Sequence, residues 1–340
     1  MKGRQIVLGA YKGREAAALL VDGHLEDLLI ASDAPPPGTI YRARADRPVK
    51  GQGGLFFKTP DGSGYLRGVK NIAPGQSVLV QVAGYAEPGK AIPMQQKVLF
   101  KSRYAIVTPE APGLNVSRRI KHEDTRDALL ECAYDAMQGS EMGLILRSSA
   151  ETADLEAVSE DIAAMRSIAE QIMADATDDP ALLLEGDGPH DLAGREWTAP
   201  ADIVSDETSF DDLDITSLIE DALAAEVALS AEASAFVEPT RALVAIDVNT
   251  GADGSFASGL KANLSLARML PRILRVRGLG GQIVLDLAPM PKKERRGFEN
   301  ALRAAFRHDD VETVLAGWTP LGHYELQRKR SRQPLQEILS

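Results

Sequence analysis

The feature that most constrains the fold is an alternation of apolar strands and helices over the last hundred residues. Two short apolar segments, residues 242–248 and 281–287, are typical of central strands, and apolar residues at helical spacing run over 261–276 between them. A further predicted helix and two predicted strands follow, over residues 292–307, 311–318 and 323–327. We therefore expect an α/β layer here.

Each of the two apolar strands carries an aspartate near its carboxyl end. Asp247 and Asp286 are costly to bury unless a cation or hydrogen bonds compensate their charges, and two of them on neighbouring strands favour a shared cation. Mg²⁺ prefers such oxygen ligands and leaves positions for water and a substrate phosphate. Asn249 is expected on the same side of its strand as Asp247. Alternatively, each aspartate caps a loop or pairs with one of the many arginines.

The amino-terminal part is predicted to form a small sheet followed by a barrel. Three apolar runs within residues 6–30 predict short strands, and Asp22-Gly23 is a two-residue turn that favours a hairpin. From residue 35 to about residue 109, five or so short β-like runs alternate with Gly, Pro and Asp-Gly turns. Several short strands separated by such turns are typical of a small β-barrel.

The middle of the chain mixes helices, one strand and irregular loops. Apolar residues at helical spacing predict a short helix over residues 125–137 and a longer one from about 150 to 176. The apolar run 143–147 predicts a short buried strand between them. Residues 178–216 are acidic and contain scattered Pro and Gly, which indicates irregular loops with short elements.

The net charge of −11 is divided unevenly along the chain. The net charge is +5 over residues 1–150, −22 over 151–240 and +6 over 241–340. A basic cluster in the last block could build a groove for nucleic acid, or it could form ordinary solvated helix faces. Its members are Arg268, Arg272, Arg275, Arg277, Lys292, Lys293, Arg295 and Arg296.

Several protein classes are excluded by composition. The single cysteine, Cys132, cannot form an internal disulfide, and no run approaches the roughly 20 apolar residues of a membrane span. The first residues lack the apolar stretch and cleavage site of a secretory signal. We therefore expect a soluble, cytoplasmic protein of about two to three domains, with no membrane partner.

Four segments of the last hundred residues resemble the catalytic domain of the ribonuclease E/G family in order, spacing and residue type. They are Arg241–Gly251, Asn263–Arg268, Arg277–Leu287 and Gly322–Arg330. The resemblance implies a DNase I-like fold and an endoribonuclease that hydrolyses single-stranded RNA to 5′-phosphate and 3′-hydroxyl ends. It also implies that Asp247 and Asp286 bind Mg²⁺, with Mn²⁺ as a possible substitute, and that Asn249 completes the catalytic set.

The resemblance covers nearly the whole chain and implies a mixed α/β architecture of several subdomains. A ribonuclease-H-like subdomain is split between residues 1–34 and 179–238. An OB-fold RNA-binding barrel spans 35–109, a 5′-monophosphate sensor spans 110–178, and the catalytic domain spans 239–340.

The same resemblance implies RNA contacts outside the catalytic set. Tyr65 matches an aromatic contact position of the barrel, whereas the second such position carries Leu55, next to Phe56 and Phe57. The remaining expected RNA contacts are basic residues: Lys90, Arg328 and Arg330.

Two further segments resemble the family's pocket for a substrate's 5′-monophosphate. Arg147 would grip the phosphate through its forked guanidinium, Ser148 would add its hydroxyl, and Val116 would contribute backbone only. The family usually has threonine where this chain has Ser148. The alternative is that Arg147 pairs with the acidic middle segment.

One feature of the family is missing from this sequence. Members commonly continue into a Cys-Pro-x-Cys motif that shares zinc between subunits, but this chain has a single cysteine. We expect no structural zinc and no zinc-linked dimer, so any oligomer would use other contacts.

Two other functions remain open at this stage. One is an RNA-binding protein that keeps the scaffold but has little or no catalysis. The other is a metal phosphohydrolase for a small phosphorylated molecule, which would need a closed pocket. We expect no role for His308 or His323, which have no evident partner in the sequence.

Overall fold

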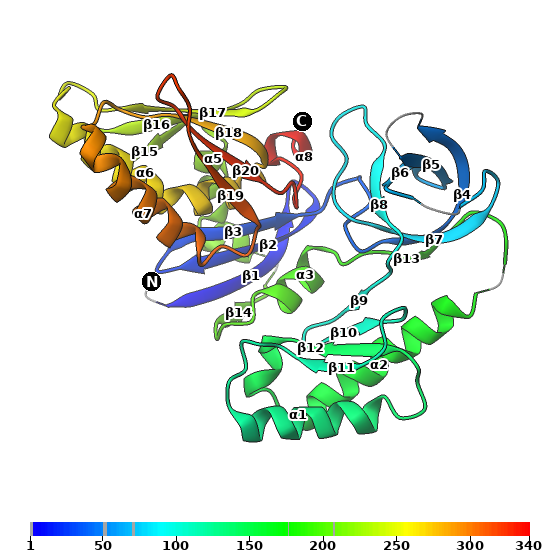
Figure 1. The fold of residues 1–340 in the computed structure, drawn as a ribbon. Helices are drawn as coiled ribbons and strands as arrows, with labels where there is room; N and C mark the ends of the chain where they lie inside the picture. The colour runs from blue at the N-terminus through cyan, green and yellow to red at the C-terminus, as the bar shows by residue number, and fades with distance from the viewer. Residues whose placement is uncertain (1–2, 50–52, 70–71, 176, 207) are drawn as a thin grey trace. The chain divides into compact units, whose positions relative to one another are not determined.

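The computed structural model describes residues 3–49, 53–69, 72–175, 177–206 and 208–340 (Figure 1). The chain divides into a first unit, residues 1–31 with 201–340, and a second unit, residues 32–200. Along the described part of the chain, no helix combines the length and apolar character needed to cross a membrane.

The first unit begins with a four-stranded sheet that contains the predicted hairpin. The strands of this sheet run in the order β14-β1-β2-β3, with β14 parallel to β1. The turn at Asp22 and Gly23 has φ values of 52° and 80°, the left-handed conformation that a tight hairpin needs. Its elements are β1 (Arg4–Tyr11), β2 (Arg14–Val21), β3 (His24–Ile30) and β14 (Asp202–Val204), with α4 (Ser209–Asp212), α5 (Ile215–Leu223) and α8 (Leu335–Ile338).

The predicted α/β layer forms the rest of the first unit. Its six-stranded sheet has the order β15-β16-β17-β18-β20-β19, in which β17 and β18 are parallel and the other pairs are antiparallel. The strands are β15 (Glu226–Ala228), β16 (Ser234–Pro239), β17 (Val244–Asn249), β18 (Gly281–Asp286), β19 (Thr313–Trp318) and β20 (Tyr324–Arg328). The helices are α6 (Phe256–Val276), the 3₁₀ turn η2 (Lys292–Glu294) and α7 (Arg295–Phe306).

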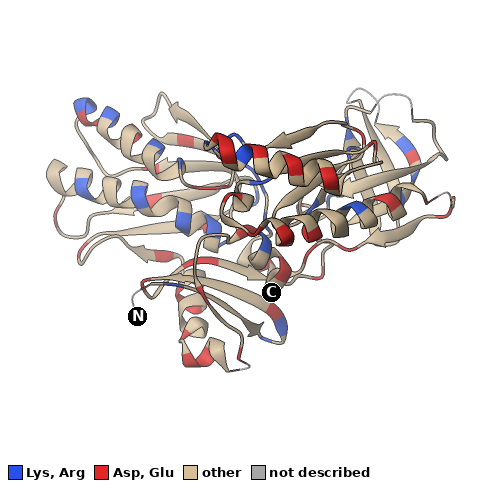
Figure 2. Cartoon of the chain, turned by 90° about the horizontal axis from the view of Figure 1, so that it is seen from below, with Lys and Arg blue, Asp and Glu red and all other residues tan. Residues whose placement is uncertain are grey.

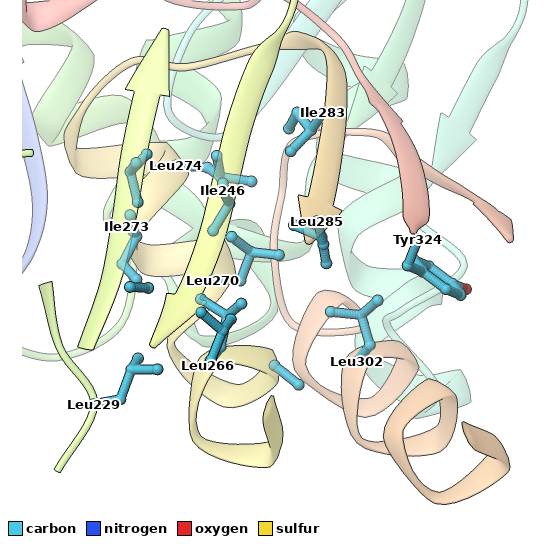
Figure 3. Close-up of a cluster of buried hydrophobic side chains, with 14 of the residues drawn as sticks. Leu229, Ile246, Leu266, Leu270, Ile273, Leu274, Ile283, Leu285, Leu302 and Tyr324 are labelled. Carbon is cyan, nitrogen blue, oxygen red and sulfur yellow. The ribbon is translucent and has the colours of Figure 1, made fainter. Parts of the chain in front are cut away.

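One face of this sheet packs against α6 and α7 (Figure 3). Alternate residues of β17 and β18, such as Ile246 and Leu285, point into this core, as the two-residue period of a strand requires. Leu266 and Leu270 of α6 and Leu302 of α7 fill it from the other side and are fully buried. Burial of this apolar area fixes which face of each strand is left for polar residues.

The second unit contains a closed five-stranded β-barrel, as expected of an OB-fold insertion. Neighbouring strands pair in the order β4-β5-β6-β8-β7, and pairing of β7 with β4 closes the barrel. The strands are β4 (Ile40–Val49), β5 (Gly54–Thr59), β6 (Gly62–Arg67), β7 (Ser77–Val82) and β8 (Ile92–Gln95). A further strand, β13 (Ala181–Leu184), also pairs with β4.

A smaller α/β layer completes the second unit. Its sheet has the order β11-β12-β10-β9, and α1 and α2 pack against it in one apolar core. The strands are β9 (Phe100–Lys101), β10 (Ala105–Thr108), β11 (Leu114–Val116) and β12 (Gly143–Leu146). The helices are α1 (Glu123–Ala136), the 3₁₀ turn η1 (Ser148–Thr152), α2 (Leu155–Met173) and α3 (Pro189–Glu196).

Two predicted boundaries differ from the structure. The helix expected from about 150 to 176 is divided into η1 and α2, and residue 176 lies outside the described residues. The family resemblance assigns residues 179–238 to the split ribonuclease-H-like subdomain, but β13 pairs with the barrel and residues up to 200 belong to the second unit. The chain rejoins the first sheet only at β14, which pairs with β1. The periodicity of the sequence alone does not reveal this pairing.

Candidate active site

The two predicted metal-binding aspartates are paired across neighbouring strands. Asp247 of β17 lies opposite Asp286 of β18 in the parallel register. Because both strands run in the same direction, their carboxyl ends meet at one edge of the sheet. The α6 crossover that joins them creates this arrangement from residues 39 positions apart.

The carboxylates lie on the sheet face opposite the helices. Val244, Ile246 and Val248 are buried, whereas Asp247 and Asn249 alternate with them and are exposed. Asp286 is likewise exposed, with 67% of its side chain accessible. The two aspartates are therefore exposed rather than buried, because α6 and α7 pack against the opposite face of their strands.

The prediction that Asn249 shares a face with Asp247 is confirmed by this alternation. The Asn249 Oδ1 accepts a hydrogen bond of 2.9 Å from the Gly251 N–H, which holds the side chain in a turn at the end of β17. Two carboxylates on an open face fit Mg²⁺, which commonly takes one or two protein carboxylates and fills its other positions with water and phosphate. The described residues contain no cluster of three or more His, Cys, Asp or Glu side chains suited to a metal, so the fit rests on these two carboxylates.

A buried amide positions the loop that follows Asp286. Asn263 of α6 is fully buried, its Nδ2 donates to the Ala288 carbonyl at 2.9 Å, and its Oδ1 accepts from the Ala288 N–H at 3.1 Å. Gly259, one helical turn earlier, approaches the Pro289 carbonyl so closely that a Cβ would collide with it. The amino-terminal part of α6 therefore fixes the loop beyond the aspartate.

His323 is a site residue that the sequence analysis missed. Its Nε2 lies 3.7 Å from the Asp286 Oδ1, and 37% of its side chain is exposed. The β19–β20 turn carries it there, because β20 is antiparallel to β18 and begins opposite Leu285. The expectation that nothing pairs with His323 is wrong; only the predicted register of β18 and β20 could have signalled it.

The basic cluster expected in this unit is only partly available to a ligand. The helices α6 and α7 carry many of these Lys and Arg residues, which are blue in Figure 2, and they pack on the sheet face opposite the aspartates. Arg277 is buried, and Arg275 forms ion pairs with Glu26 and Asp309. Lys292 and Lys293 are exposed in η2, shortly after Asp286 in the chain.

Arg328, a predicted RNA contact, is a structural residue in this structure. It is 2% exposed, and its Nη1 donates to the Asp309 carboxylate and, at 2.9 Å, to the Thr313 hydroxyl. Its position two residues after buried Leu326 points it into the helix-covered face, so it cannot reach RNA from there. Arg330 is exposed, with its guanidinium over the backbone of Gly281, and stays a candidate RNA contact.

The barrel presents an aromatic pair. Tyr65 of β6 lies opposite Phe56 of β5, with ring centroids 5.4 Å apart, and both are half-buried. Leu55 points into the barrel core and is 3% exposed, so Phe56 takes the outward place at this position. The two-residue alternation of β5 could have identified Phe56. Lys90 is exposed and forms an ion pair of 2.9 Å with Glu87.

The residues of the predicted phosphate pocket come together at one sheet edge in the second unit. Val116 ends β11 opposite Leu146, the last residue of the parallel strand β12, and the Ser117 N–H donates to the Leu146 carbonyl at 2.8 Å. Arg147 and Ser148 follow directly, so all three predicted residues lie at the carboxyl end of this strand pair.

Arg147 already has a carboxylate partner. Its Nη2 donates to the Glu196 Oε2 at 2.5 Å, and its Nη1 donates to the Ser102 carbonyl at 2.7 Å. Burial by itself raises the pKa of the Glu196 carboxyl, but the charges of Arg147 and Arg195 outweigh it and lower the pKa below its usual value. The alternative that Arg147 pairs with the acidic middle segment is thus realised in this structure.

The sequence matches the Ribonuclease E/G family over residues 100–198 and 195–331, which together exceed half of the chain. The chain belongs to the Ribonuclease E/G family. This membership confirms the resemblance carried by the aspartate strands and their neighbours.

Curated relatives extend the similarity across the chain. It is 27% identical to Ribonuclease E of Nostoc sp., over 98% of this chain and 57% of that protein. It is 27% identical to Ribonuclease G of Salmonella typhimurium, over 79% of this chain and 62% of that protein. It is 28% identical to Ribonuclease E of Escherichia coli, over 77% of this chain and 28% of that protein. The chain therefore spans less than two thirds of the length of these relatives.

Proposed function

We propose that this chain is a divalent-metal-dependent endoribonuclease that hydrolyses single-stranded RNA and leaves 5′-phosphate and 3′-hydroxyl ends. The observation that carries the proposal is the pairing of Asp247 with Asp286, with Asn249 on the same open sheet face, in a chain of the Ribonuclease E/G family. The relatives that match most of the chain are themselves named ribonucleases.

In this proposal Asp247 and Asp286 hold Mg²⁺, or Mn²⁺ in its place. The bound ion would supply activation of water and neutralisation of the charge that develops on the phosphodiester. Asn249 orients the scissile phosphate through its amide, while its Oδ1 remains tied to the Gly251 N–H. An extended RNA strand can reach carboxylates that are exposed on an open face, which favours a polymer over a small phosphorylated substrate.

RNA binding is assigned to exposed aromatic and basic side chains. Phe56 and Tyr65 offer half-exposed rings on which bases can stack, and Lys90 is an exposed cation of the same barrel region. In the first unit, Arg330 and the η2 lysines are exposed and can contact backbone phosphates. Because such contacts release counterions, the affinity for RNA should fall steeply with added salt.

A 5′-monophosphate sensor is part of the same proposal. Val116, Arg147 and Ser148 converge at the carboxyl end of β11 and β12. The Arg147 guanidinium can bind a terminal phosphate through a charge-assisted fork, and the Ser148 hydroxyl and nearby backbone can add hydrogen bonds.

The test is cleavage of a short unstructured RNA with Mg²⁺ or EDTA. We compare the wild type with Asp247→Asn, Asp286→Asn and the control Asp221→Asn, an exposed carboxylate on α5. We expect Mg²⁺-dependent cuts, with kcat/KM lowered at least about a hundredfold by either site variant because transition-state charge stabilisation is lost. The control should cleave like the wild type.

Product ends provide a second readout. Hydrolysis by activated water yields ends that a ligase specific for 5′-phosphates accepts. Cuts that persist in EDTA and carry 2′,3′-cyclic phosphates would contradict the proposal. Tight RNA binding without any cleavage by the wild type would instead support a non-catalytic RNA-binding protein on this scaffold.

A further inference from the structure

The bonds of Arg147 show that its side chain is already engaged as an anion receptor. One terminal nitrogen, Nη1, donates to the Ser102 carbonyl at 2.7 Å and reaches the Arg195 carbonyl at 3.4 Å. The other, Nη2, donates to the Glu196 carboxylate at 2.5 Å. The backbone bonds fix where the guanidinium lies, and the charged partner is a carboxylate.

Glu196 is itself held from a second side. Arg195 donates from its Nε to the Glu196 Oε1 at 2.7 Å, and Arg195 also pairs with Asp187. Each oxygen of the Glu196 carboxylate thus accepts from a different arginine. Two guanidinium groups therefore converge on one anionic group, which is the arrangement that proteins use for carboxylate and phosphate alike.

The backbone that carries Glu196 is anchored, whereas its side chain is partly exposed to solvent. Glu196 is the last residue of α3, between the buried residues Ala193 and Trp197. The Arg103 guanidinium also bonds to the Gly194 carbonyl, which ties α3 to the segment before β10. The Glu196 side chain is nevertheless 41% exposed, against 21% for that of Arg147. A rotamer change could release Arg147 without unfolding α3.

Resting on the 5′-sensor of the proposed function, we propose that Glu196 is a specificity-determining residue whose carboxylate occupies the phosphate position on Arg147. A 5′-monophosphorylated RNA end must displace it, whereas a 5′-hydroxyl end has no group to compete for Arg147. A monophosphate carries more charge and more acceptor oxygens than a carboxylate, so displacement is feasible. The preference for monophosphorylated RNA is then weaker than in a pocket without this carboxylate.

The proposal predicts a gain of discrimination when the charge is removed. Glu196→Gln keeps the shape of the side chain but replaces the anionic oxygens by a neutral amide. The ratio of kcat/KM for 5′-monophosphate RNA over 5′-hydroxyl RNA should rise about three- to tenfold, as expected for removal of a partly exposed charged competitor. The matched control is Glu170→Gln, because Glu170 pairs with Arg166 at 2.7 Å on the surface of α2, and its ratio should equal that of the wild type.

The dependence on Arg147 distinguishes competition from a purely structural ion pair. In the double variant Glu196→Gln with Arg147→Gln, the gain should disappear, since no guanidinium remains to bind the phosphate. A structural pair would alter thermal unfolding in Glu196→Gln but leave the ratio unchanged. If Glu196→Gln folds poorly, Glu196→Asp shortens the side chain and should raise the ratio in the same direction by a smaller factor.

Binding in EDTA separates failure of this inference from failure of the nuclease assignment. The probe is a 3′-labelled RNA hexamer with either a 5′-monophosphate or a 5′-hydroxyl, and fluorescence anisotropy gives both Kd values. A larger affinity ratio in Glu196→Gln than in the wild type supports the inference even where no cleavage occurs. An unchanged ratio in both binding and cleavage overturns it and leaves the nuclease assignment untouched.

Discussion

Replacing Asn263 by alanine tests how the fold positions the loop beyond Asp286. The side chain is fully buried and makes two hydrogen bonds to the backbone of Ala288, at 2.9 and 3.1 Å. Asn263→Ala removes both bonds and leaves a buried N–H and a buried carbonyl without partners. At about 1–3 kcal/mol for each unsatisfied group, the loss is about 2–6 kcal/mol. This is a large share of the roughly 5–15 kcal/mol that stabilises a typical domain.

The assay is unfolding in urea, monitored by the fluorescence of Trp318, which packs against the core of the first unit's six-stranded sheet. A Trp197→Phe background leaves Trp318 as the single tryptophan, because the chain has two. The first unit is then followed separately, which matters because two units need not unfold together. Asn300→Ala is the control, since Asn300 is exposed on α7 and its Oδ1 accepts a surface hydrogen bond of 3.0 Å from Arg303.

The control should lose less than about 0.5 kcal/mol, as surface substitutions do. Asn263→Ala should shift the urea midpoint strongly without changing the slope. A loss below about 1 kcal/mol would refute the reasoning, because the Ala288 groups would then find other partners at little cost. RNA cleavage should also fall in Asn263→Ala at temperatures where the variant remains folded, because the loop following the aspartate loses its anchor.

Four further outcomes follow from the contacts described. Arg328→Ala should cost about 1.5–3 kcal/mol in urea unfolding, because the buried Asp309 carboxylate loses one of its two arginine partners and keeps Arg275. Phe56→Ala should weaken binding of single-stranded RNA by about 1–3 kcal/mol in an anisotropy titration, whereas Leu55→Ala should chiefly lower the stability of the barrel. Gly259→Ala should lower the melting temperature of the first unit, since its Cβ meets the backbone of the loop after β18. The pKa of Glu196 is lower in the folded protein than in the unfolded chain, so its ion pairs stabilise the fold above the unfolded pKa of about 4.3. This stabilisation is lost as the pH falls through the folded pKa. The melting temperatures of the wild type and Glu196→Gln should therefore converge at low pH.

Many strands could be predicted from the sequence because apolar residues recur along them in a regular pattern. The hairpin around Asp22-Gly23 and the βαβ unit of β17, α6 and β18 form as expected. The same-face relation of Asp247 and Asn249 needs only the two-residue period of a strand. The same period predicts that Arg328 shares the buried face of Leu326, and that Phe56 lies on the face opposite Leu55.

The remaining contacts join residues that no local pattern connects. Glu196 lies 49 positions from Arg147. The segment contains many acidic residues, and nothing in the sequence indicates which of them pairs with Arg147. His323 meets Asp286 only through the register of β18 and β20. The exposure of both aspartates depends on helices covering one sheet face, which the apolar character of the strands does not disclose. Such features are consequences of tertiary packing rather than of local propensity.

The parallel pairing of β14 with β1 has a consequence for folding on the ribosome. Gln5 pairs with Asp202, which is synthesised 197 positions later. At a synthesis rate of about 5–20 residues per second, one edge of β1 stays unpaired for about 10–40 s. During this interval the nascent hairpin offers hydrogen-bonding groups to any extended chain nearby. The second unit is made of residues 32–200, which are all synthesised before β14, so it can fold during this interval. A longer insertion there would extend the exposure of β1 without altering either fold.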